Sequence, residues 1–178
     1  MSKAVFMDRD GTIGGSKKVL YPNEFEPYPY MQDAIRKLKE ADYVIYAFSN
    51  QPGISKGEVT RQDFEEELLR YGFDKIYICP HQHHENCLCR KPAPYMLQKA
   101  AKESQLTLGE CFVIGDRWTD MLAAHEAGCR KILVKTGAGQ EAYDRYKQKV
   151  YFGKYAEVKP DYMADNFMKA AEWIVKNK

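Results

Sequence analysis

The feature of this sequence that most constrains its fold is a regular alternation of short apolar runs with amphipathic stretches. Apolar runs of strand length occupy residues 4–7, 43–48, 76–78, 111–114 and 132–134. Between and after them, apolar residues recur at helical spacing in residues 31–41, 61–71, 94–103, 121–127 and 167–175. Strands that alternate with helices pair as parallel neighbours, because each helix supplies the crossover that a parallel connection needs. We therefore expect an α/β fold with a central parallel sheet and helices on both faces.

Length and composition fit a single domain of this kind over residues 1–178. The chain has 178 residues, 44% of them hydrophobic, which is enough for a sizeable core. The net charge of +2 carries no signature of a nucleic-acid or membrane partner. The apolar run 4–7 is too short for a signal peptide, and charged residues follow it at once. We expect a monomeric, cytoplasmic protein.

Two details of the helical pattern are specific enough to test. Gly128 stands where a helix over 121–127 would end, and glycine favours that position. Asp165 or Asn166 is expected to cap the last helix. Residues 136–160 are polar, with several glycines and tyrosines, and no element is assigned to them.

Chemically capable side chains follow four of the predicted strands. Open parallel sheets bind ligands outside the carboxyl ends of their strands, so these residues should converge. The segments, in chain order, are Asp8-Arg9-Asp10-Gly11-Thr12, Ser49-Asn50-Gln51, a Cys/His cluster leading to Arg90-Lys91-Pro92, and Gly115-Asp116-Arg117 with Asp120.

The carboxylates in these segments indicate phosphoryl-transfer chemistry. Asp8, Asp10 and Asp116 at one edge would repel each other unless a cation lay among them, and oxygen ligands suit Mg²⁺. One of the paired aspartates could act as nucleophile and the other as proton carrier. The Ser49 hydroxyl and the Lys91 ammonium could bind the phosphoryl oxygens. Each segment alone is typical of an ordinary turn or helix cap, but turns do not require three aspartates and a lysine at successive strand ends.

In this order, the four segments resemble the motifs of the haloacid dehalogenase phosphatases over nearly the whole chain. Within that superfamily, the chain is similar to the D-glycero-D-manno-heptose 1,7-bisphosphate 7-phosphatases and to the histidinol-phosphate phosphatases. The resemblance implies a Rossmann-like fold and a Mg²⁺-dependent hydrolysis of phosphomonoesters in two steps, through an aspartyl-phosphate.

The resemblance also implies a role for each matching residue. Asp8 would attack phosphorus, and Asp10 would protonate the leaving alcohol and then deprotonate the hydrolytic water. Asp8, the backbone carbonyl of Asp10, and Asp116 would hold Mg²⁺. Contacts to the phosphoryl group and substrate are implied for Ser49, Asn50, Gln51, Arg90, Lys91 and Arg117. Thr12 and Asp120 are expected to support the site, Asp120 by positioning Lys91 or the outer shell of the metal.

Three cysteines and a histidine within eleven residues predict a structural Zn²⁺ site. The ligands are Cys79, His81, Cys87 and Cys89, whose number and softness match a closed tetrahedral site. By chemistry alone His83 or His84 could replace His81, and the loop could be metal-free. The resemblance favours His81, because related phosphatases share the pattern Cys-x-His…Cys-x-Cys.

The zinc is expected to hold the loop that presents Arg90 and Lys91. Cys111 and Cys129 lie in apolar settings, and we expect them to be core residues.

The spacing of the motifs leaves no room for a separate cap domain. From Asp8 to Ser49 there are 41 positions, and from Ser49 to Lys91 there are 42. The site should therefore be open to a small phosphorylated metabolite. Lys17 and Lys18 could meet a second phosphate, although a lysine pair is typical of a solvated turn.

The substrate itself is less constrained than the reaction. Residues 20–26 resemble the heptose phosphatases, which favours a sugar bisphosphate. The chain departs from them at Gly14-Gly15 and at Pro52, and its five-residue spacer before Cys87 resembles the histidinol-phosphate enzymes. The alternatives are histidinol phosphate, a 3′-phosphorylated polynucleotide, and a catalytically inactive module that binds phosphorylated ligands. The lack of a basic stripe disfavours nucleic acid, and the complete set of catalytic aspartates disfavours an inactive module.

Overall fold

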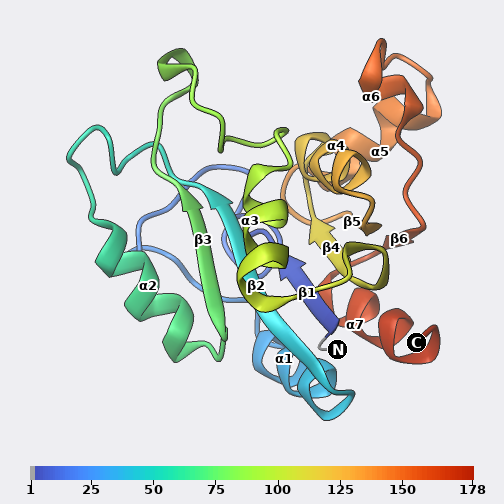
Figure 1. Ribbon diagram of the computed structural model, residues 1–178, viewed down its shortest axis with the longest axis horizontal. Coiled ribbons are helices and arrows are strands. Elements are labelled where there is room, and N and C mark those ends of the chain that lie inside the picture. Colours follow the sequence, from blue (N-terminus) through green and yellow to red (C-terminus); the bar gives the residue numbers. More distant parts are fainter. Residues whose placement is uncertain (1–2) are drawn as a thin grey trace.

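The computed structural model describes residues 3–178 and contains one six-stranded, fully parallel sheet (Figure 1). The strands lie in the order β3-β2-β1-β4-β5-β6, and each neighbouring pair is parallel. Their bounds are β1 (Lys3–Met7), β2 (Tyr43–Asn50), β3 (Lys75–Cys79), β4 (Phe112–Gly115), β5 (Arg130–Val134) and β6 (Tyr162–Ala164). The predicted α/β fold is confirmed.

Helices cover both faces of the sheet, as predicted (Figure 1). On one face, α1 (Met31–Glu40) and α7 (Phe167–Lys176) pack over strand residues such as Val5 and Ile114. On the other, α3 (Tyr95–Ser104), α4 (Trp118–Ala127) and α5 (Gly139–Lys147) pack over residues such as Phe6 and Val113. Because successive side chains of a strand point to opposite faces, each central strand contributes to both cores. The remaining elements are α2 (Arg61–Arg70), α6 (Lys154–Glu157) and the short 3₁₀ turns η1 (His83–Glu85) and η2 (Leu108–Glu110).

The predicted helix ends are partly correct. Gly128 ends α4 in the left-handed conformation, with φ of 78°, as predicted. Asn166 caps α7 by accepting a hydrogen bond from the backbone of Lys169, whereas Asp165 is paired with Lys135 and is not the cap. The predicted start of α4 at residue 121 was wrong, because the helix begins at Trp118.

The early start of α4 follows from a polar cap. The Asp120 carboxylate accepts a hydrogen bond from the backbone of Arg117 at 3.1 Å, which satisfies an amide that a helix start leaves open. A search for apolar periodicity alone misses this first turn, which carries Asp120.

Apart from the two 3₁₀ turns, three elements were not predicted: α5, α6 and β6. All three lie at or beyond the polar stretch 136–160, and β6 is only three residues long. No helix among residues 3–178 is long and apolar enough to cross a membrane.

The strand order creates a crevice between β1 and β4. The chain moves outward from β1 through β2 to β3, then crosses back and moves outward from β4 on the other side. At such a switch point the crossovers diverge and leave room for a ligand at the carboxyl ends of the strands. The backbone of Asp8 donates to Ile114 at 3.1 Å, which holds the two strand ends together. In the part of the chain that the structure describes, no cap domain covers this edge, as expected from the motif spacing.

Candidate active site and cysteine cluster

Lys91 lies at the centre of the crevice and joins two of its carboxylates. Its ammonium contacts Asp8 Oδ1 at 2.9 Å and Asp120 Oδ1 at 2.7 Å, and it donates to the carbonyl of Phe48 at 2.9 Å. Burial alone would lower the pKa of Lys91, but the charges of Asp120 and Asp8 outweigh it and raise the pKa. Lys91 therefore stays charged at neutral pH, next to the carboxylate that the sequence singles out as nucleophile.

Asp8, Asp116 and Asp120 form a compact cluster of buried carboxylates. One oxygen from each lies within 4.8 Å of the others. Burial, followed by the charges of Asp8 and Asp120, raises the pKa of Asp116 well above its usual range. Burial also raises the pKa of Asp120 to about 6, even though Lys91 acts to lower it. A further cation at this cluster would favour the ionised form of Asp116 and Asp120.

The balance of buried charge supports a divalent cation at this cluster. Five acidic side chains are buried here and only two basic ones, Arg9 and Lys91, which leaves an excess of three negative charges if all ionise. The acids are Asp8, Asp10, Glu67, Asp116 and Asp120. Uncompensated buried charge is costly, and Mg²⁺ is bound through one or two carboxylates together with water and phosphate. The donor set fits that ion.

Two glycines make room for Asp116. A Cβ atom at Gly11 or at Gly137 would lie 2.2 Å from Asp116 Oδ2, and Gly11 also has a φ of 81°. That same oxygen accepts a hydrogen bond from the backbone of Ala138 at 2.8 Å, and Thr12 Oγ1 lies 3.4 Å from Oδ1. The absence of a side chain at Gly11 and Gly137 thus lets the two loops that carry them pack against the Asp116 carboxylate.

Asp10 is held by three donors. Its Oδ1 accepts from Arg9 Nη1 at 2.8 Å and from the backbone of Leu20 at 3.0 Å, and its Oδ2 accepts from Gln51 Nε2 at 2.9 Å. Burial raises the pKa of Asp10, although Arg9 acts to lower it. A fixed carboxyl group with a raised pKa suits a residue that both gives and takes a proton.

Arg9 and Glu67 are the site residues that the sequence analysis missed. The guanidinium of Arg9 is fully buried and binds both oxygens of Glu67, at 2.6 and 2.9 Å. It also lies over the Phe25 ring, 3.8 Å from its centre. A buried arginine next to Asp8 has no sequence signature of its own, because arginine is usually exposed. The position of Glu67 could have indicated its burial, because it lies next to Leu68 on the side of α2 that is buried.

The residues predicted to contact substrate divide into two groups. Asn50, Arg90, Lys91 and Arg117 line a cavity of about 290 Å³ together with Asp8 and Asp10. Ser49 and Gln51 are buried instead, and Gln51 donates to both Ser49 Oγ, at 2.7 Å, and Asp10. The structure therefore places the Gln51 side chain behind Asp10.

The Lys91 loop is tied to its surroundings at both ends. The Asn50 side chain accepts from the backbone amide of Lys91 at 3.1 Å and donates to its carbonyl at 3.3 Å. Arg90 donates to the carbonyl of His81 at 3.1 Å. Asn50 and Arg90 thus fix the backbone on either side of the Lys91 side chain.

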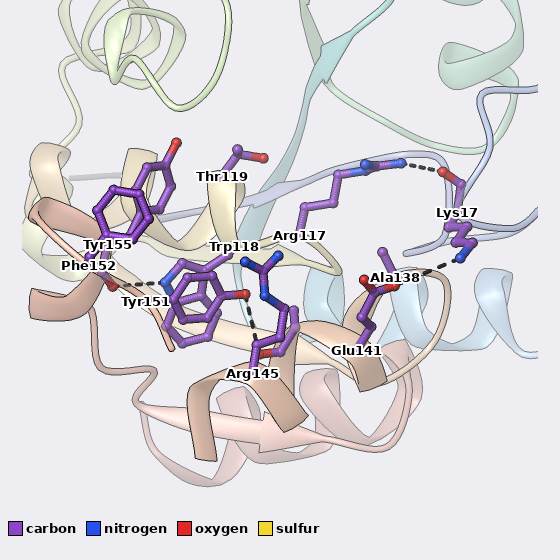
Figure 2. A pocket seen from close by; sticks show the side chains of 11 residues that line it. Lys17, Arg117, Trp118, Thr119, Ala138, Glu141, Arg145, Tyr151, Phe152 and Tyr155 are labelled. Carbon is purple, nitrogen blue, oxygen red and sulfur yellow. Dashed lines mark hydrogen bonds and ion pairs between the residues drawn. The ribbon is translucent and has the colours of Figure 1, made fainter. Parts of the chain in front are cut away.

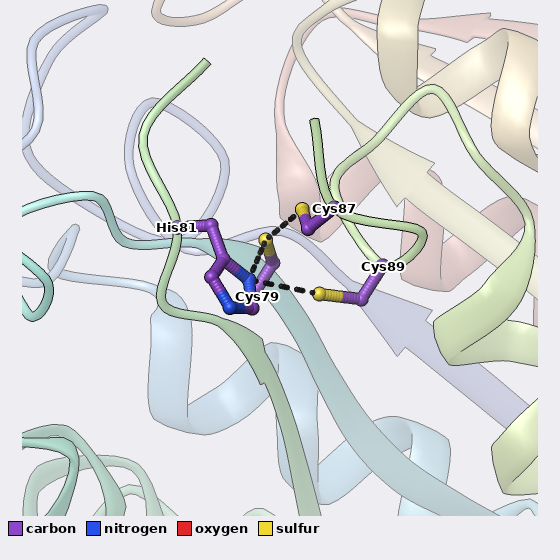
Figure 3. Close-up of side chains that lie close together, drawn as sticks. All are labelled: Cys79, His81, Cys87 and Cys89. Atoms are coloured by element: carbon purple, nitrogen blue, oxygen red, sulfur yellow. Dashed lines mark hydrogen bonds between the residues drawn. The ribbon is translucent and has the colours of Figure 1, made fainter. Parts of the chain in front are cut away.

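Cys79, His81, Cys87 and Cys89 converge, with one ligand atom from each within 4.8 Å of the others (Figure 3). The sulfurs of Cys79 and Cys87 lie 3.5 Å apart, and His81 Nδ1 lies 3.6 Å from Cys79 Sγ and 3.3 Å from Cys89 Sγ. A tetrahedral zinc site has edges of about 3.8 Å between sulfurs and about 3.6 Å between sulfur and nitrogen, given its bond lengths. The cluster fits such an ion. His83 and His84 lie on η1, outside the cluster.

The thiols of this cluster also point to a cation. Burial raises the pKa of Cys79. Burial acts in the same direction on Cys87, but hydrogen bonds from Cys79 and from the backbone of Arg90 and Cys89 lower its pKa to about 7. Three thiolates this close would repel each other, and a bound metal ion deprotonates and holds such thiols together.

Comparison with known protein families gives a match over most of the chain. A model described as haloacid dehalogenase-like hydrolase matches residues 15–128, and a second HAD-like hydrolase model matches residues 88–170. The chain is similar to the D-glycero-beta-D-manno-heptose-1,7-bisphosphate 7-phosphatase of Helicobacter pylori strain 26695. The two are 37% identical over 146 residues, which cover 75% of this chain and 83% of that protein.

Further similarities span nearly all of the chain. The corresponding 7-phosphatase of Haemophilus ducreyi is 29% identical over 89% of this chain and 97% of its own. Among solved structures, the D,D-heptose 1,7-bisphosphate phosphatase of B. bronchiseptica, complexed with magnesium and phosphate, superposes with a TM-score of 0.82 at 28% identity. That superposition covers 99% of both chains.

Proposed function

Because this chain belongs to the haloacid dehalogenase-like hydrolases and carries their phosphatase site, we propose that it removes the 7-phosphate of D-glycero-D-manno-heptose 1,7-bisphosphate. The observation that carries this proposal is the buried set of Asp8, Asp10, Lys91 and Asp116 in one crevice. The similarity to the Helicobacter pylori 7-phosphatase over 75% of this chain supports the substrate.

In the first step Asp8 attacks phosphorus, and the bond between phosphorus and the sugar oxygen breaks. Asp10 gives its proton to that oxygen, so the alcohol leaves neutral. Lys91, which already contacts Asp8, binds the oxygens of the phosphoryl group as it transfers. Phosphoryl transfer depends mainly on such positioning and charge neutralisation.

In the second step Asp10 takes a proton from water, which attacks the phosphorus of the aspartyl-phosphate and releases phosphate and Asp8. The three donors around Asp10 keep the same carboxyl in place for both proton transfers. Asp8, Asp116 and the backbone carbonyl of Asp10 would hold Mg²⁺, which supplies positive charge to the phosphoryl oxygens when bound.

The cysteine cluster is proposed to hold a structural Zn²⁺. Four protein ligands close the coordination sphere, which suits a structural rather than a catalytic ion. The ion would fix the loop that runs from β3 to Lys91. The first ligand, Cys79, is also joined to the site, because its carbonyl accepts a hydrogen bond from the backbone of Gln51 at 2.8 Å. Elemental analysis of the purified protein should find about one zinc per chain.

We also propose a cellular compartment and an oligomeric state for the enzyme. The five cysteines, all within residues 3–178, form no disulfide, which supports a reducing compartment such as the cytoplasm. We further propose a monomer of one domain that acts on a small phosphorylated metabolite. Sedimentation equilibrium tests the oligomeric state.

The decisive experiment is a phosphatase screen with Mg²⁺ over four substrates. These are the heptose bisphosphate, histidinol phosphate, a nucleotide and a 3′-phosphorylated oligonucleotide. The bisphosphate should be hydrolysed with the highest kcat/KM, and Asp8→Asn should abolish that activity while its circular dichroism spectrum matches the wild type. A higher kcat/KM with another of the four compounds would make that compound the substrate in place of the heptose bisphosphate. Activity retained in Asp8→Asn would refute Asp8 as nucleophile.

A further inference from the structure

The two oxygens of the Asp10 carboxyl group have different surroundings. Oδ1 accepts two hydrogen bonds, from Arg9 Nη1 at 2.8 Å and from the backbone amide of Leu20 at 3.0 Å. Oδ2 accepts one hydrogen bond within residues 3–178, from Gln51 Nε2 at 2.9 Å. Each oxygen of a carboxylate accepts about two hydrogen bonds, so both acceptor positions of Oδ1 are occupied and one position of Oδ2 is left. Because Asp10 lines the cavity of about 290 Å³, a substrate group bound there can meet Oδ2 without displacing a donor.

The two donors on Oδ1 are held in place by further contacts. Arg9 binds both oxygens of Glu67, at 2.6 and 2.9 Å, and its guanidinium is fully buried. The segment that carries Leu20 is tied to the start of α4, because the Arg117 guanidinium donates to the carbonyl of Lys17 (Figure 2). A proton on Oδ1 would face a positive guanidinium and a fixed backbone N–H, neither of which can accept it. Oδ1 therefore stays an acceptor.

Gln51 lies behind Oδ2 and does not line the cavity. Its side chain is fully buried, and its Nε2 also donates to Ser49 Oγ at 2.7 Å. Both hydrogens of the amide are used in this way, one on each acceptor. Its Oε1 is buried and has no hydrogen-bond partner among residues 3–178. An unpaired buried carbonyl oxygen lowers stability, so the amide is oriented to serve its two acceptors at the expense of its own oxygen.

We infer that Oδ2 carries the proton that Asp10 transfers, and that Gln51 is the positioning residue that holds this oxygen toward the leaving group. This role rests on the proposed function, since it requires Asp10 to be the proton carrier. In the first step the Oδ2–H bond breaks and the proton passes to the bridging oxygen, as that oxygen separates from phosphorus and Asp8 bonds to it. In the second step a water O–H bond breaks, its proton passes to Oδ2, and the water oxygen displaces Asp8 from phosphorus. Gln51 occupies the other position of Oδ2 in both steps, which leaves the proton only the position toward the substrate.

The kinetic test compares two kinds of leaving group. An alkoxide needs a proton to leave phosphorus and p-nitrophenolate does not, and kcat/KM covers only the steps up to departure of the leaving group. The substrates are p-nitrophenyl phosphate and whichever alkyl phosphate of the screen has the highest kcat/KM. Gln51→Met removes both donors at nearly constant volume, and it should lower kcat/KM for the alkyl phosphate at least about tenfold more than for p-nitrophenyl phosphate. Asn50→Ala is the matched control, because it loosens Lys91, which acts on the phosphoryl oxygens, and should lower kcat/KM for both substrates alike.

A crystal structure of the wild type with Mg²⁺ and orthovanadate tests the same role without a variant. Vanadate bound to Asp8 has an axial oxygen in the place of the leaving oxygen. That oxygen should lie within hydrogen-bond distance of Asp10 Oδ2, while Gln51 Nε2 still contacts Oδ2. A contact through Oδ1 instead, or a Gln51 side chain turned onto the vanadate, would overturn the role.

The kinetic outcomes separate the role of Gln51 from the proposed function. A selective loss in Gln51→Met, with equal losses in Asn50→Ala, supports the role. If Gln51→Met has the circular dichroism spectrum of the wild type and lowers kcat/KM for both substrates equally, or for neither, the role is wrong and the proposed function stands. If Asn50→Ala shows the same selectivity, general damage to the site explains it and the role is again wrong. If the wild type hydrolyses p-nitrophenyl phosphate but no alkyl phosphate, both proposals fail.

Discussion

Replacing Glu67 by Gln should destabilise this protein by about 3 kcal/mol. Both oxygens of Glu67 bind the fully buried guanidinium of Arg9, at 2.6 and 2.9 Å. Gln keeps the shape but not the charge, and either orientation of its amide turns an NH₂ group toward an arginine N–H. Removing one partner of a buried ion pair costs about 3–5 kcal/mol, and Asp10 remains as a second partner at 2.8 Å, which places the cost at the lower end.

The assay is unfolding by urea and by heat, followed by circular dichroism at a fixed Mg²⁺ concentration. For a chain of this length, 3 kcal/mol corresponds to a drop in Tm of about 6–12 °C. Glu66→Gln is the matched control, because Glu66 is the exposed neighbour on the same helix and accepts a hydrogen bond from Gln62. That variant should stay within about 0.5 kcal/mol of the wild type.

A double variant separates the lost pairing from the lost packing. Arg9→Met with Glu67→Leu removes both charges together, and a buried pair replaced by apolar residues is often nearly neutral in stability. In this variant Asp10 loses Arg9 as a donor but keeps its hydrogen bonds from Leu20 and Gln51. We expect it to be more stable than Glu67→Gln alone. A loss below about 1 kcal/mol in Glu67→Gln, or a double variant less stable than the single one, would refute the reasoning.

Two further predictions follow from the loops of the site. A chelator that removes the proposed zinc should reduce phosphatase activity and open residues 80–90 to proteolysis while the far-ultraviolet spectrum stays unchanged, because the proposed ion fixes a loop and not the sheet. A metal-free, fully active protein would contradict this. Gly115→Ala should lower kcat, because the new Cβ would lie 2.3 Å from Asp120 Oδ2 and displace the carboxylate that holds Lys91. Gly109→Ala, where the nearest atom is 4.0 Å away, is its control, and equal activities of the two variants would show that Asp120 does not need its position.

The sequence alone was sufficient to predict the layers of the fold and the edge of the sheet that carries the site. Apolar runs and helical periodicity predict five of the six strands, because buried strands and amphipathic helices follow directly from burial. The strand β6 was not predicted, because a strand of three residues is too short to show a periodic pattern. The helices α5 and α6 were not predicted because their stretch is mostly polar: α5 buries Gly139 and Ala142, and α6 buries no residue.

The contacts within the site could not be predicted in the same way. The sequence analysis placed Ser49 and Asn50 after β2, but they are its last two residues. Sequence spacing brought Gln51 to the site but could not show that its side chain lies behind Asp10. Arg9 was hidden for a physical reason: its burial depends on Glu67 and Phe25, which come from distant parts of the chain.

The crossing from β3 back to β4 has a consequence for how the protein is made. Asp8 and Asp116 lie at the ends of adjacent strands, yet 108 positions separate them in the chain. At typical synthesis rates a ribosome needs roughly 5–20 s to cover that distance. Before β4 is made, β1 can pair with β2 on one side only. Its other edge, and the turn that carries Asp8 and Asp10, remain unpaired. The nascent chain therefore exposes the centre of its future sheet until β4 emerges, and the site cannot be complete before Asp116 and Asp120 have been made.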